Sequence, residues 1–540
     1  MRRGQHWAGD EKSERTTDQR LALAVMLVIV VATSLFWCVR KSGWFLDEVY
    51  TYGLSNSHYA PFVRNLKSDN MVDTIFAREE LTDYLSVQEN ERFDIGSVWY
   101  NQQQDVHPPL YYLLVNFCSS LFPESYSKWL VLAPNLLIQL LTACVLFRLL
   151  LDLTDRVETS AFATLLYAVS TTGIETVIYA RMYVLLTLLT VVLALNLSRL
   201  LDNWSLWRVL GIAALITLGM LTQYYFVFYA FFSCLACLLV LLVRREYRHA
   251  LTFCMLGISG VALFVIIWPA VISHVLTGQA GGPSGTGVLG SLLAFGNYPR
   301  KLLVYAYYIL KGMPVGSVLW ALSLAGLPIL VHLRKRRSSD DVRVPLSKLF
   351  VVVVPAFVTL VVAAVASPYE HLRYAYNVCP LFFVALGTHL SLLEGTASKR
   401  SLRVGFVAAC MLTLLGSAVW QPEYLYPQQA TYEAELAPYR EDPCIFLDDN
   451  HIVPLTQELP RLLCFDEVFV TDDPTSRQLA DYIEQNDSKD VVVYVSLFGE
   501  HDSYDVGTAA EVMAEALGYD EVTPLYTYEH VKTYLLHEGD

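Results

Sequence analysis

Charged residues are scarce in this chain of 540 residues. Asp, Glu, Lys and Arg together make up 17% of it, against 54% hydrophobic residues and a mean hydropathy of +0.39. A soluble protein usually carries more charge. The composition therefore excludes an ordinary set of soluble domains and predicts a polytopic α-helical membrane protein.

The signatures of several other functions are also absent. The glycine-rich stretch 279–287 has no GKS or GKT after it and no strand before it, so it is neither a P-loop nor a dinucleotide fingerprint. It predicts a loop, either a plain linker or a substrate lid. No CxxC-type metal pair lies outside the apolar runs, since Cys234 and Cys237 lie inside one and are expected to pack there. No small-residue cleavage site follows the first apolar run, which predicts a retained signal anchor.

The formal net charge of −14 is unevenly distributed. Basic residues cluster in short loops, whereas acids dominate the first long loop and the C-terminal tail. An acidic surface repels phosphate backbones, so nucleic acid is excluded as an expected partner.

Eleven apolar runs approach or exceed the roughly 20 residues that a bilayer-crossing helix needs. They are residues 21–39, 128–150, 160–178, 183–201, 208–222, 226–243, 251–273, 315–331, 346–366, 375–393 and 404–420. The run 110–122 is only about 13 residues long and predicts a re-entrant or interfacial helix. If that helix does not cross, every basic loop falls on the side of the basic N-terminus, as the positive-inside rule requires.

This count of spans predicts a chain of three parts. They are a cytoplasmic tail at 1–20, a transmembrane catalytic domain at 21–420 whose first external loop spans 41–127, and an external α/β domain at 421–540. The expected location is the plasma membrane, with the N-terminus cytoplasmic and with the active site and C-terminal domain extracytoplasmic.

Beyond residue 420 the pattern becomes that of a small soluble domain. Strands are expected at 444–447, 467–471 and 491–497, helices at 475–485 and 508–517, and a hairpin at 523–528 and 531–536. Strands alternating with helices imply a small α/β sheet. Residues 448–451 (DDNH) follow the first strand, at an edge where ligands often bind, or form a solvated acidic loop. Cys444 and Cys464 precede consecutive strands, so a disulfide is within reach.

Asp47 and Glu48 directly follow the first apolar run, where a membrane helix would meet water. A carboxylate there can take a proton from an acceptor hydroxyl, and partial desolvation raises its basicity. One of the two could be the base while the other holds an amine, a sugar hydroxyl or a metal. Both could instead be hydrated acids at a helix end.

Residues 105–112 (DVHPPLYY) form a more specific motif. The two prolines fix an extended entry and then permit a helix to start. They place His107 at the mouth of the short helix, where an imidazole can contact a phosphate or a metal.

These motifs carry a resemblance to a known family. An Asp-Glu pair after the first span, a long external loop, the HPPLYY run and then residues 180–183 (ARMY) resemble glycosyltransferase family 39 and related branches of the GT-C superfamily. That group includes the protein O-mannosyltransferases and the lipid A aminoarabinose transferases. The resemblance covers roughly residues 20–400 and leaves the C-terminal domain outside it.

The resemblance implies a transferase in contact with membrane lipids. It would take a sugar from a polyprenyl-phosphate donor on the outer side and pass it, generally with inversion, to a hydroxyl of a glycan, lipid or protein. By position, Asp47 matches the family's general base, Glu48 its acidic neighbour and His107 the motif bordering the donor pocket. A sugar phosphate is already activated, so the protein mainly needs a base, cations and orientation.

The remaining candidates are cations and aromatic residues near span ends. The substrate-binding set is His107, Tyr111, Arg181, Tyr183, Arg373 and Tyr374, with Arg300 and Lys301 as weaker phosphate ligands. Arginine suits phosphate because its fork stays charged and binds two oxygens at once. Each cation could instead be a snorkelling anchor at the membrane surface.

The metal question stays open in the sequence. Some family members carry a metal-binding acid in the second external turn, where this chain has Arg181 and Tyr183, with Glu175 several residues earlier. The sequence defines no cofactor site, and Glu48 and His371, with Glu370, could hold a divalent cation although their spacing does not demand one.

Three rival functions are kept. A secondary transporter or lipid flippase would show repeats, midplane charges or broken helices, whereas this chain shows no obvious repeat and keeps most ionisable residues at span ends. An assembly protein could use the spans only as an anchor for the tail. Within the enzyme class, transfer of a whole oligosaccharide is an alternative to transfer of one sugar.

Overall fold

The chain divides into two compact units. The computed structural model describes residues 2–276, 291, 293–319, 321–322, 346–391, 398–486, 488–499 and 504–539. The first unit comprises Met1–Val39, Val106–Tyr111 and Leu132–Glu423, and the second comprises Arg40–Asp105, Tyr112–Val131 and Tyr424–Asp540. This division differs from the expected domains, because most of residues 41–127 group with the C-terminal domain and not with the long apolar helices.

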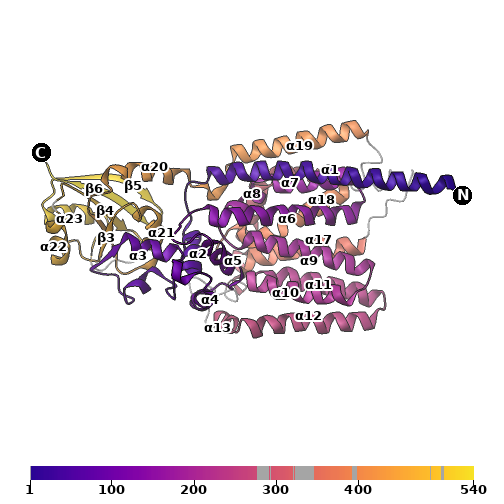
Figure 1. Cartoon of the computed structure of the whole chain (residues 1–540), viewed down its shortest axis with the longest axis horizontal. Coiled ribbons are helices and arrows are strands. Elements are labelled where there is room, and N and C mark those ends of the chain that lie inside the picture. The colour runs from indigo at the N-terminus through magenta and orange to yellow at the C-terminus, as the bar shows by residue number, and fades with distance from the viewer. Residues whose placement is uncertain are drawn as a thin grey trace. The chain divides into compact units, whose positions relative to one another are not determined.

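The first unit consists of helices (Figure 1). In chain order they are α1 (Arg2–Arg40), α6 (Trp129–Thr154), α7 (Val157–Ala168), α8 (Thr171–Ile178), α9 (Tyr183–Asp202), α10 (Leu206–Thr222), α11 (Phe226–Val243), α12 (Tyr247–Ile267), α13 (Ala270–Leu276), α15 (Tyr298–Gly312), α17 (Leu346–Ala366), α18 (Cys379–Ser391) and α19 (Lys399–Val419), with the 3-10 turns η4 (Phe295–Asn297) and η5 (Leu372–Val378).

Seven helices in the described part of the chain are long and apolar enough to cross a membrane. They are α1 (over Thr17–Arg40), α6, α9, α11, α12, α17 and α19, and there are eight if the bent pair α7 and α8 counts as one span. The prediction of many apolar helices is therefore confirmed. The number of helices that could cross a membrane, however, differs from the expected eleven. The runs 208–222 and 375–393 give helices of only 17 and 13 residues, and most of 315–331, like the loop 279–287, lies outside the described residues.

The bend between α7 and α8 measures 60°. Ser170 has an extended backbone at this point, and its hydroxyl accepts a hydrogen bond from the amide of Gly173 at 3.1 Å. A serine cap begins a new helix instead of continuing the old one. The expected continuous span at 160–178 is therefore broken, and α8 ends in the turn that carries the ARMY motif.

The second unit combines the first loop with the C-terminal part. Its elements are α2 (Leu46–Asn56), η1 (Val63–Lys67), β1 (Thr74–Ala77), α3 (Arg78–Leu85), η2 (Glu89–Glu91), α4 (Ile95–Gln104), most of α5 (Leu110–Ser120), η6 (Glu423–Leu425), α20 (Pro427–Leu436), η7 (Ala437–Tyr439), β2 (Cys444–Leu447), α21 (Ile452–Leu462), β3 (Glu467–Thr471), α22 (Arg477–Asn486), β4 (Asp490–Ser496), α23 (Ala509–Leu517), β5 (Glu521–Tyr528) and β6 (Val531–His537). At 11 residues, α5 is short and apolar as predicted.

A six-stranded sheet organises this unit, in the order β1-β3-β2-β4-β6-β5. The central strands β3, β2 and β4 run parallel, whereas β1, β6 and β5 pair antiparallel. The predicted small α/β domain is confirmed, including its closing hairpin. The helix α21 and the strand β1 were not predicted from the sequence. Strand β1 brings residues 74–77 of the first loop into the sheet, with Phe76 opposite Val468.

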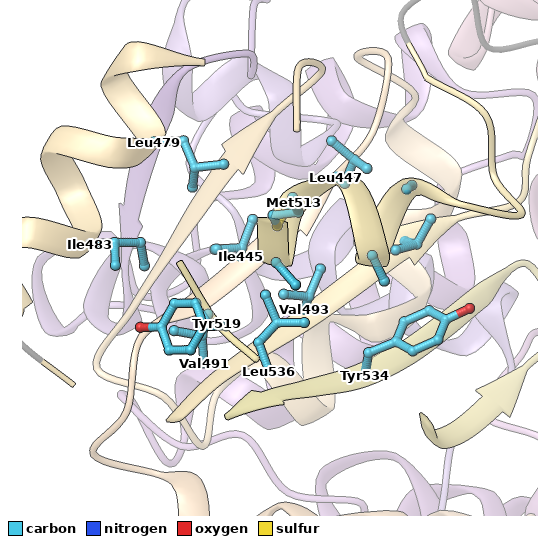
Figure 2. Close-up of a cluster of buried hydrophobic side chains, with 14 of the residues drawn as sticks. Ile445, Leu447, Leu479, Ile483, Val491, Val493, Met513, Tyr519, Tyr534 and Leu536 are labelled. Atoms are coloured by element: carbon cyan, nitrogen blue, oxygen red, sulfur yellow. The ribbon is translucent and has the colours of Figure 1, made fainter. Parts of the chain in front are cut away.

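The core of the sheet lies between one of its faces and the helices α22 and α23 (Figure 2). Alternate strand residues point to this face, so Ile445, Val493 and Leu536 are fully buried there against Leu479 and Met513. Burying a side chain of this size contributes about 1.5–3 kcal/mol.

The opposite face of the sheet is aromatic. Phe446 stacks on Tyr494 with ring centroids 5.7 Å apart, and Tyr526 of β5 stacks on Tyr432 of α20 at 4.2 Å. The sheet is therefore covered on both faces, as expected for one with parallel central strands.

The DDNH segment begins at the buried end of β2. Asp448 is fully buried, its backbone amide donates to the carbonyl of Thr471, and its carboxylate accepts from the amide of His451 at 2.5 Å. At least its first residue is therefore not a solvated acid. Burial raises the pKa of the Asp448 carboxyl to about 6.

Replacing Asp448 should change the pH dependence of stability. Because the folded-state pKa lies above the unfolded value of 3.8, the protonated side chain favours the fold at low pH, and this contribution is lost as pH rises through about 6. Asp448→Asn stays neutral, so its stability relative to the parent should rise by on the order of 2 kcal/mol between about pH 4.5 and pH 7.5. Unfolding midpoints at the two pH values measure this, with Asp449→Asn as the control. Equal shifts for both variants would contradict it.

Cys444 and Cys464 are free thiols in the structure, so the disulfide that their positions in the sequence allow is not formed. Burial raises the pKa of both, that of Cys464 to about 11. Thiolates are the reactive form in disulfide exchange. Burial thus disfavours the reaction that would join the pair.

Candidate functional site

The turn between α8 and α9, residues 179–182, gathers most of the predicted substrate-binding residues of the first unit. Arg181 is buried in it, and its Nη2 lies 3.2 Å from Nε2 of His107. A guanidinium can only donate, so Nε2 of the imidazole is the acceptor, and the neutral ring carries its proton on Nδ1. The HPP and ARMY motifs, 74 residues apart in the chain, therefore meet.

Arg373 lies in η5, almost 200 residues later in the chain, and contacts the same turn. It is buried, its Nη1 donates to the hydroxyl of Tyr179 at 2.9 Å, and its Cζ lies 5.5 Å from the ring centre of Tyr374. Tyr179 stacks on Tyr183, with centroids 5.7 Å apart and planes 11° apart. Two predicted arginines are thus positioned on one turn by aromatic side chains.

Tyr111 is connected to this turn through a residue that the sequence did not single out. Its hydroxyl donates to Oδ1 of Asn135 in α6 at 2.9 Å, and Nδ2 of Asn135 donates to the carbonyl of Val177 at 3.0 Å. The first turn of α5 is thereby tied to the end of α8. Because the fully buried side-chain amide of Asn135 hydrogen-bonds to both α5 and α8, it fixes the distance between these two helices.

Glu175, the acid nearest to the ARMY turn, is engaged with protein groups. Its Oε2 accepts from the hydroxyl of Tyr376 at 2.8 Å, and its Oε1 accepts from the amide of Glu423 at 3.1 Å. His371 lies 4.0 Å from the carboxylate of Glu423. Within the described ranges, no group of three or more His, Cys, Asp and Glu side chains could hold a metal ion. The suggested partnership of Glu48 and His371 in a metal site therefore gains no support.

The two weaker phosphate candidates have other contacts. The side chain of Arg300 is 78% exposed and lies 3.3 Å from the carboxylate of Glu370. Lys301 is buried and donates to the carbonyls of Val365 and Ser367 at 3.2 and 2.7 Å. Since these carbonyls lie at and just beyond the end of α17, Lys301 caps that helix.

The second unit holds the Asp-Glu pair on the first turn of α2. The two side chains leave the helix about 100° apart, and they have different environments. Glu48 is fully buried, and its Oε2 accepts from Lys41 at 2.9 Å and from the amide of Phe45 at 2.8 Å. Asp47 is half-exposed. Geometry therefore favours Asp47 as the residue that can meet a substrate and assigns Glu48 to the support of α2.

Lys41 was not predicted as a residue of the site, yet together with Glu48 it holds the start of α2 in place. It is almost fully buried, and besides Glu48 it donates to the carbonyl of Tyr424 at 2.7 Å. It also lies 5.4 Å from the ring centre of Trp44. A buried pair with these additional contacts fixes the start of α2, and with it the position of Asp47, relative to the C-terminal part.

Removing Lys41 should therefore destabilise the second unit. Lys41→Met leaves the carboxylate of Glu48 buried without its counter-ion, which typically costs about 3–5 kcal/mol of unfolding free energy. Lys41→Met/Glu48→Gln should recover much of this loss, because the glutamine oxygen can still accept from Phe45. Hydrogen exchange of the α2 amides measures both variants. A stable Lys41→Met protein would contradict the supporting role.

Three residues of the site that the sequence analysis did not single out each have a weak feature in the sequence that points to them. Tyr179 directly precedes the ARMY run, and Tyr376 follows Arg373 by three positions, so each lies beside a recognised motif. Asn135, like Gln139, is an amide side chain inside an apolar run, which is costly unless hydrogen-bonded and for that reason often structural or functional. The partners of these residues depend on contacts between distant segments.

The chain combines many apolar helices with motif-bearing turns and an Asp-Glu pair. A model of one known family matches part of it. The family model that matches is that of the dolichyl-phosphate-mannose-protein mannosyltransferases. It covers residues 106–272, less than half of the chain, and includes the HPP and ARMY motifs.

Solved structures are similar at low identity. ArnT from Cupriavidus metallidurans bound to undecaprenyl phosphate matches with 12% identity and a TM-score of 0.49, over 95% of this chain and 97% of that one. The oligosaccharyltransferase of Archaeoglobus fulgidus, in complex with Zn and sulfate, matches with 12% identity and a TM-score of 0.40, over 95% and 72%. Similarity at this level says nothing about substrate or mechanism. No curated protein matches the chain.

Proposed function

We propose that this protein transfers a single sugar from a polyprenyl-phosphate donor to a hydroxyl acceptor on the extracytoplasmic side of the plasma membrane. The observation that carries the proposal is the pair of buried arginines at the α8–α9 turn, Arg181 beside His107 and Arg373 on Tyr179. Two buried guanidinium groups near helix ends suit a phosphate in a poorly hydrated place. The matched family's description, which contains dolichyl phosphate mannose, supports the same donor class.

The reaction needs one base and one leaving group. The acceptor oxygen attacks the anomeric carbon, the bond from that carbon to the phosphate oxygen breaks, and the hydroxyl proton passes to the carboxylate of Asp47. Polyprenyl phosphate leaves with the bonding electron pair, and Arg181 and Arg373 stabilise its developing charge. A single displacement of this kind inverts the configuration at the anomeric carbon.

An apolar pocket in the first unit supports a lipid-linked donor. It has a volume of about 330 Å³, lies between α15, α17 and α18, and is lined among others by Leu310, Phe357 and Phe383. A segment of a prenyl chain is the proposed occupant, since only an apolar chain gains free energy there. The distribution of basic loops supports the proposed orientation, with a cytoplasmic N-terminus.

Donor turnover tests the proposal. The purified chain in proteoliposomes receives radiolabelled polyprenyl-phosphate sugars that differ only in the sugar, with and without a chelator. We expect release of one sugar class from the carrier. A chain that consumes none of these donors but moves labelled lipid between the leaflets would be a flippase, and consumption only of oligosaccharide-linked carriers would favour the alternative enzyme.

A further inference from the structure

The helix α21 carries three polar side chains into the interior of the second unit. Gln457, Glu458 and Arg461 are each 1% exposed or less. They lie on one side of the helix, because residues three and four apart face the same way when an α-helix turns once every 3.6 residues. Buried amides and charges are costly unless hydrogen bonds satisfy them. The partners of these three side chains therefore decide what the region can do.

Only part of their hydrogen-bonding capacity is used. Nε of Arg461 donates to Oε2 of Glu458 at 2.6 Å, and Nε2 of Gln457 donates to the carbonyl of Tyr528 at 3.2 Å. Among the residues that the structure describes, Nη1 and Nη2 of Arg461 have no hydrogen-bond partner, and neither do the Oε1 atoms of Gln457 and Glu458. A guanidinium stays charged in any surroundings, so Arg461 cannot lose a proton to avoid the need for acceptors.

The unpartnered atoms define the chemistry of a group that would satisfy them. Nη1 and Nη2 of Arg461 need acceptors, whereas the two Oε1 atoms need donors. An anion such as phosphate or a carboxylate only accepts, and an ammonium group only donates. Hydroxyl groups do both, so a molecule with several neighbouring hydroxyls matches this set of atoms.

Aromatic rings border the same polar atoms. Cζ of Arg461 lies 4.5 Å from the ring centre of Tyr528. Tyr526, two residues earlier on β5, faces the same side of the sheet and stacks on Tyr432 of α20, with centroids 4.2 Å and planes 9° apart. Water gains little from such rings, whereas the apolar C–H face of a sugar ring packs on them. The rings thus favour a saccharide over a cluster of water molecules.

The helix α20 contributes Tyr432 to this region and buries little of its own surface. Of its ten residues only Gln429 and Leu436 are buried. Besides the ring stack, it is held by Gln429, which accepts from the amide of Trp44 at 2.8 Å and donates to the carbonyl of Trp44 at 3.0 Å. Segments with few buried apolar contacts open locally at a low free-energy cost. Opening of α20 gives a ligand a route to the aromatic rings and α21.

We propose that Gln457, Glu458 and Arg461 form a binding site for a neutral saccharide. Nη1 and Nη2 of Arg461 donate to hydroxyl oxygens of the sugar, Oε1 of Gln457 and of Glu458 accept from neighbouring hydroxyls, and one face of the sugar packs on an aromatic ring. The binding itself does not rest on the proposed function. The identification of this saccharide as the glycan acceptor does rest on it.

Saccharide binding to the full-length protein in detergent, measured without any donor, tests the proposal. The probes are mannose, glucose, galactose, N-acetylglucosamine and maltotriose, with inorganic phosphate and acetate as anionic probes. Calorimetric titration gives the affinities, and hydrogen exchange of the α20 and α21 amides locates the site. We expect at least one saccharide to bind and to slow exchange in α21, and neither anion to do so.

Glu458→Met/Arg461→Met is the most informative variant, because it removes both charges together. Replacing a buried ion pair by apolar residues often preserves or raises stability. We therefore expect an unfolding midpoint at or above that of the parent and a saccharide affinity lower by about tenfold or more, since several hydrogen bonds are lost. Gln457→Met should also weaken binding, and it decides the case if the double variant does not fold.

Gln485→Met is the matched control. It replaces an exposed amide on α22, which packs on the opposite face of the sheet, and it should bind the saccharide as the parent does. A parent that binds none of the saccharides, or binds phosphate or acetate more tightly, overturns the proposal, as does a folded double variant with parental affinity. If the parent binds a saccharide at α21 but consumes no donor in proteoliposomes, the binding site stands, and its role as the acceptor site fails together with the proposed function.

Discussion

Asp47→Asn should lose sugar transfer almost completely while the protein keeps its fold and its donor affinity. The substitution preserves the size of the side chain but removes the group that takes the acceptor proton. Loss of a general base typically lowers turnover by about 10²- to 10⁴-fold. Donor binding should be retained, because Arg181, Arg373 and the apolar pocket are unchanged. Initial rates of transfer and equilibrium binding of the labelled donor, measured on the same preparation, separate the two effects.

Two comparisons sharpen this expectation. Asp466→Asn removes a carboxylate whose side chain is 78% exposed and whose ion-pair partner is Arg78, so it should leave turnover unchanged. Glu48→Gln keeps an acceptor for the amide of Phe45 and should affect stability more than the chemical step. An Asp47→Asn protein with parental turnover would remove Asp47 as the base.

Arg373→Ala should also cause a large loss of activity, seen as a lower kcat/KM for the donor. If its guanidinium stabilises the leaving phosphate, its removal should lower kcat/KM for the donor by about 10²- to 10³-fold, the usual effect of deleting one such donor of hydrogen bonds. Arg373→Lys should recover little, because an ammonium group cannot replace the planar fork that binds two oxygens. Steady-state kinetics over a range of donor concentrations measure this.

The variant Tyr179→Phe provides a matched control for Arg373. It removes only the hydroxyl that accepts from Nη1 of Arg373, so the arginine stays charged but loses its orientation. A loss of about tenfold, clearly smaller than for Arg373→Ala, is expected. Because Arg373 is buried, unfolding midpoints must accompany the kinetics. A correctly folded Arg373→Ala protein with parental kcat/KM would exclude the phosphate role.

How far the sequence could predict this protein is clearest at particular elements. Apolar runs of about 20 residues predict spanning helices because the bilayer itself demands that length. The strands β2, β3 and β4 were predicted because each is a short, locally apolar run. The broken span at Ser170 was not, because a single serine inside an apolar run decides whether one helix or two form.

The candidate site shows the same limit. The motifs were visible because they are contiguous, and the structure brings His107, Tyr111, Arg181, Tyr183 and Arg373 to one turn as a set. Their supporting residues were not visible. The partner of Glu48 is Lys41, seven positions earlier and before the helix begins, and no helical periodicity predicts such a pair.

The sequence by itself determined the membrane class, the main helices, the parallel strands of the C-terminal part and the short motifs, because each of these depends on composition or spacing within one segment. Only the tertiary structure decided that the first loop contributes β1 to the C-terminal sheet, that the hydroxyl of Tyr179 accepts from Arg373, and that the hydroxyl of Tyr528 donates to the carbonyl of Trp44. Strand pairing and hydrogen bonding across hundreds of residues depend on the packing of the whole unit, which no local pattern encodes.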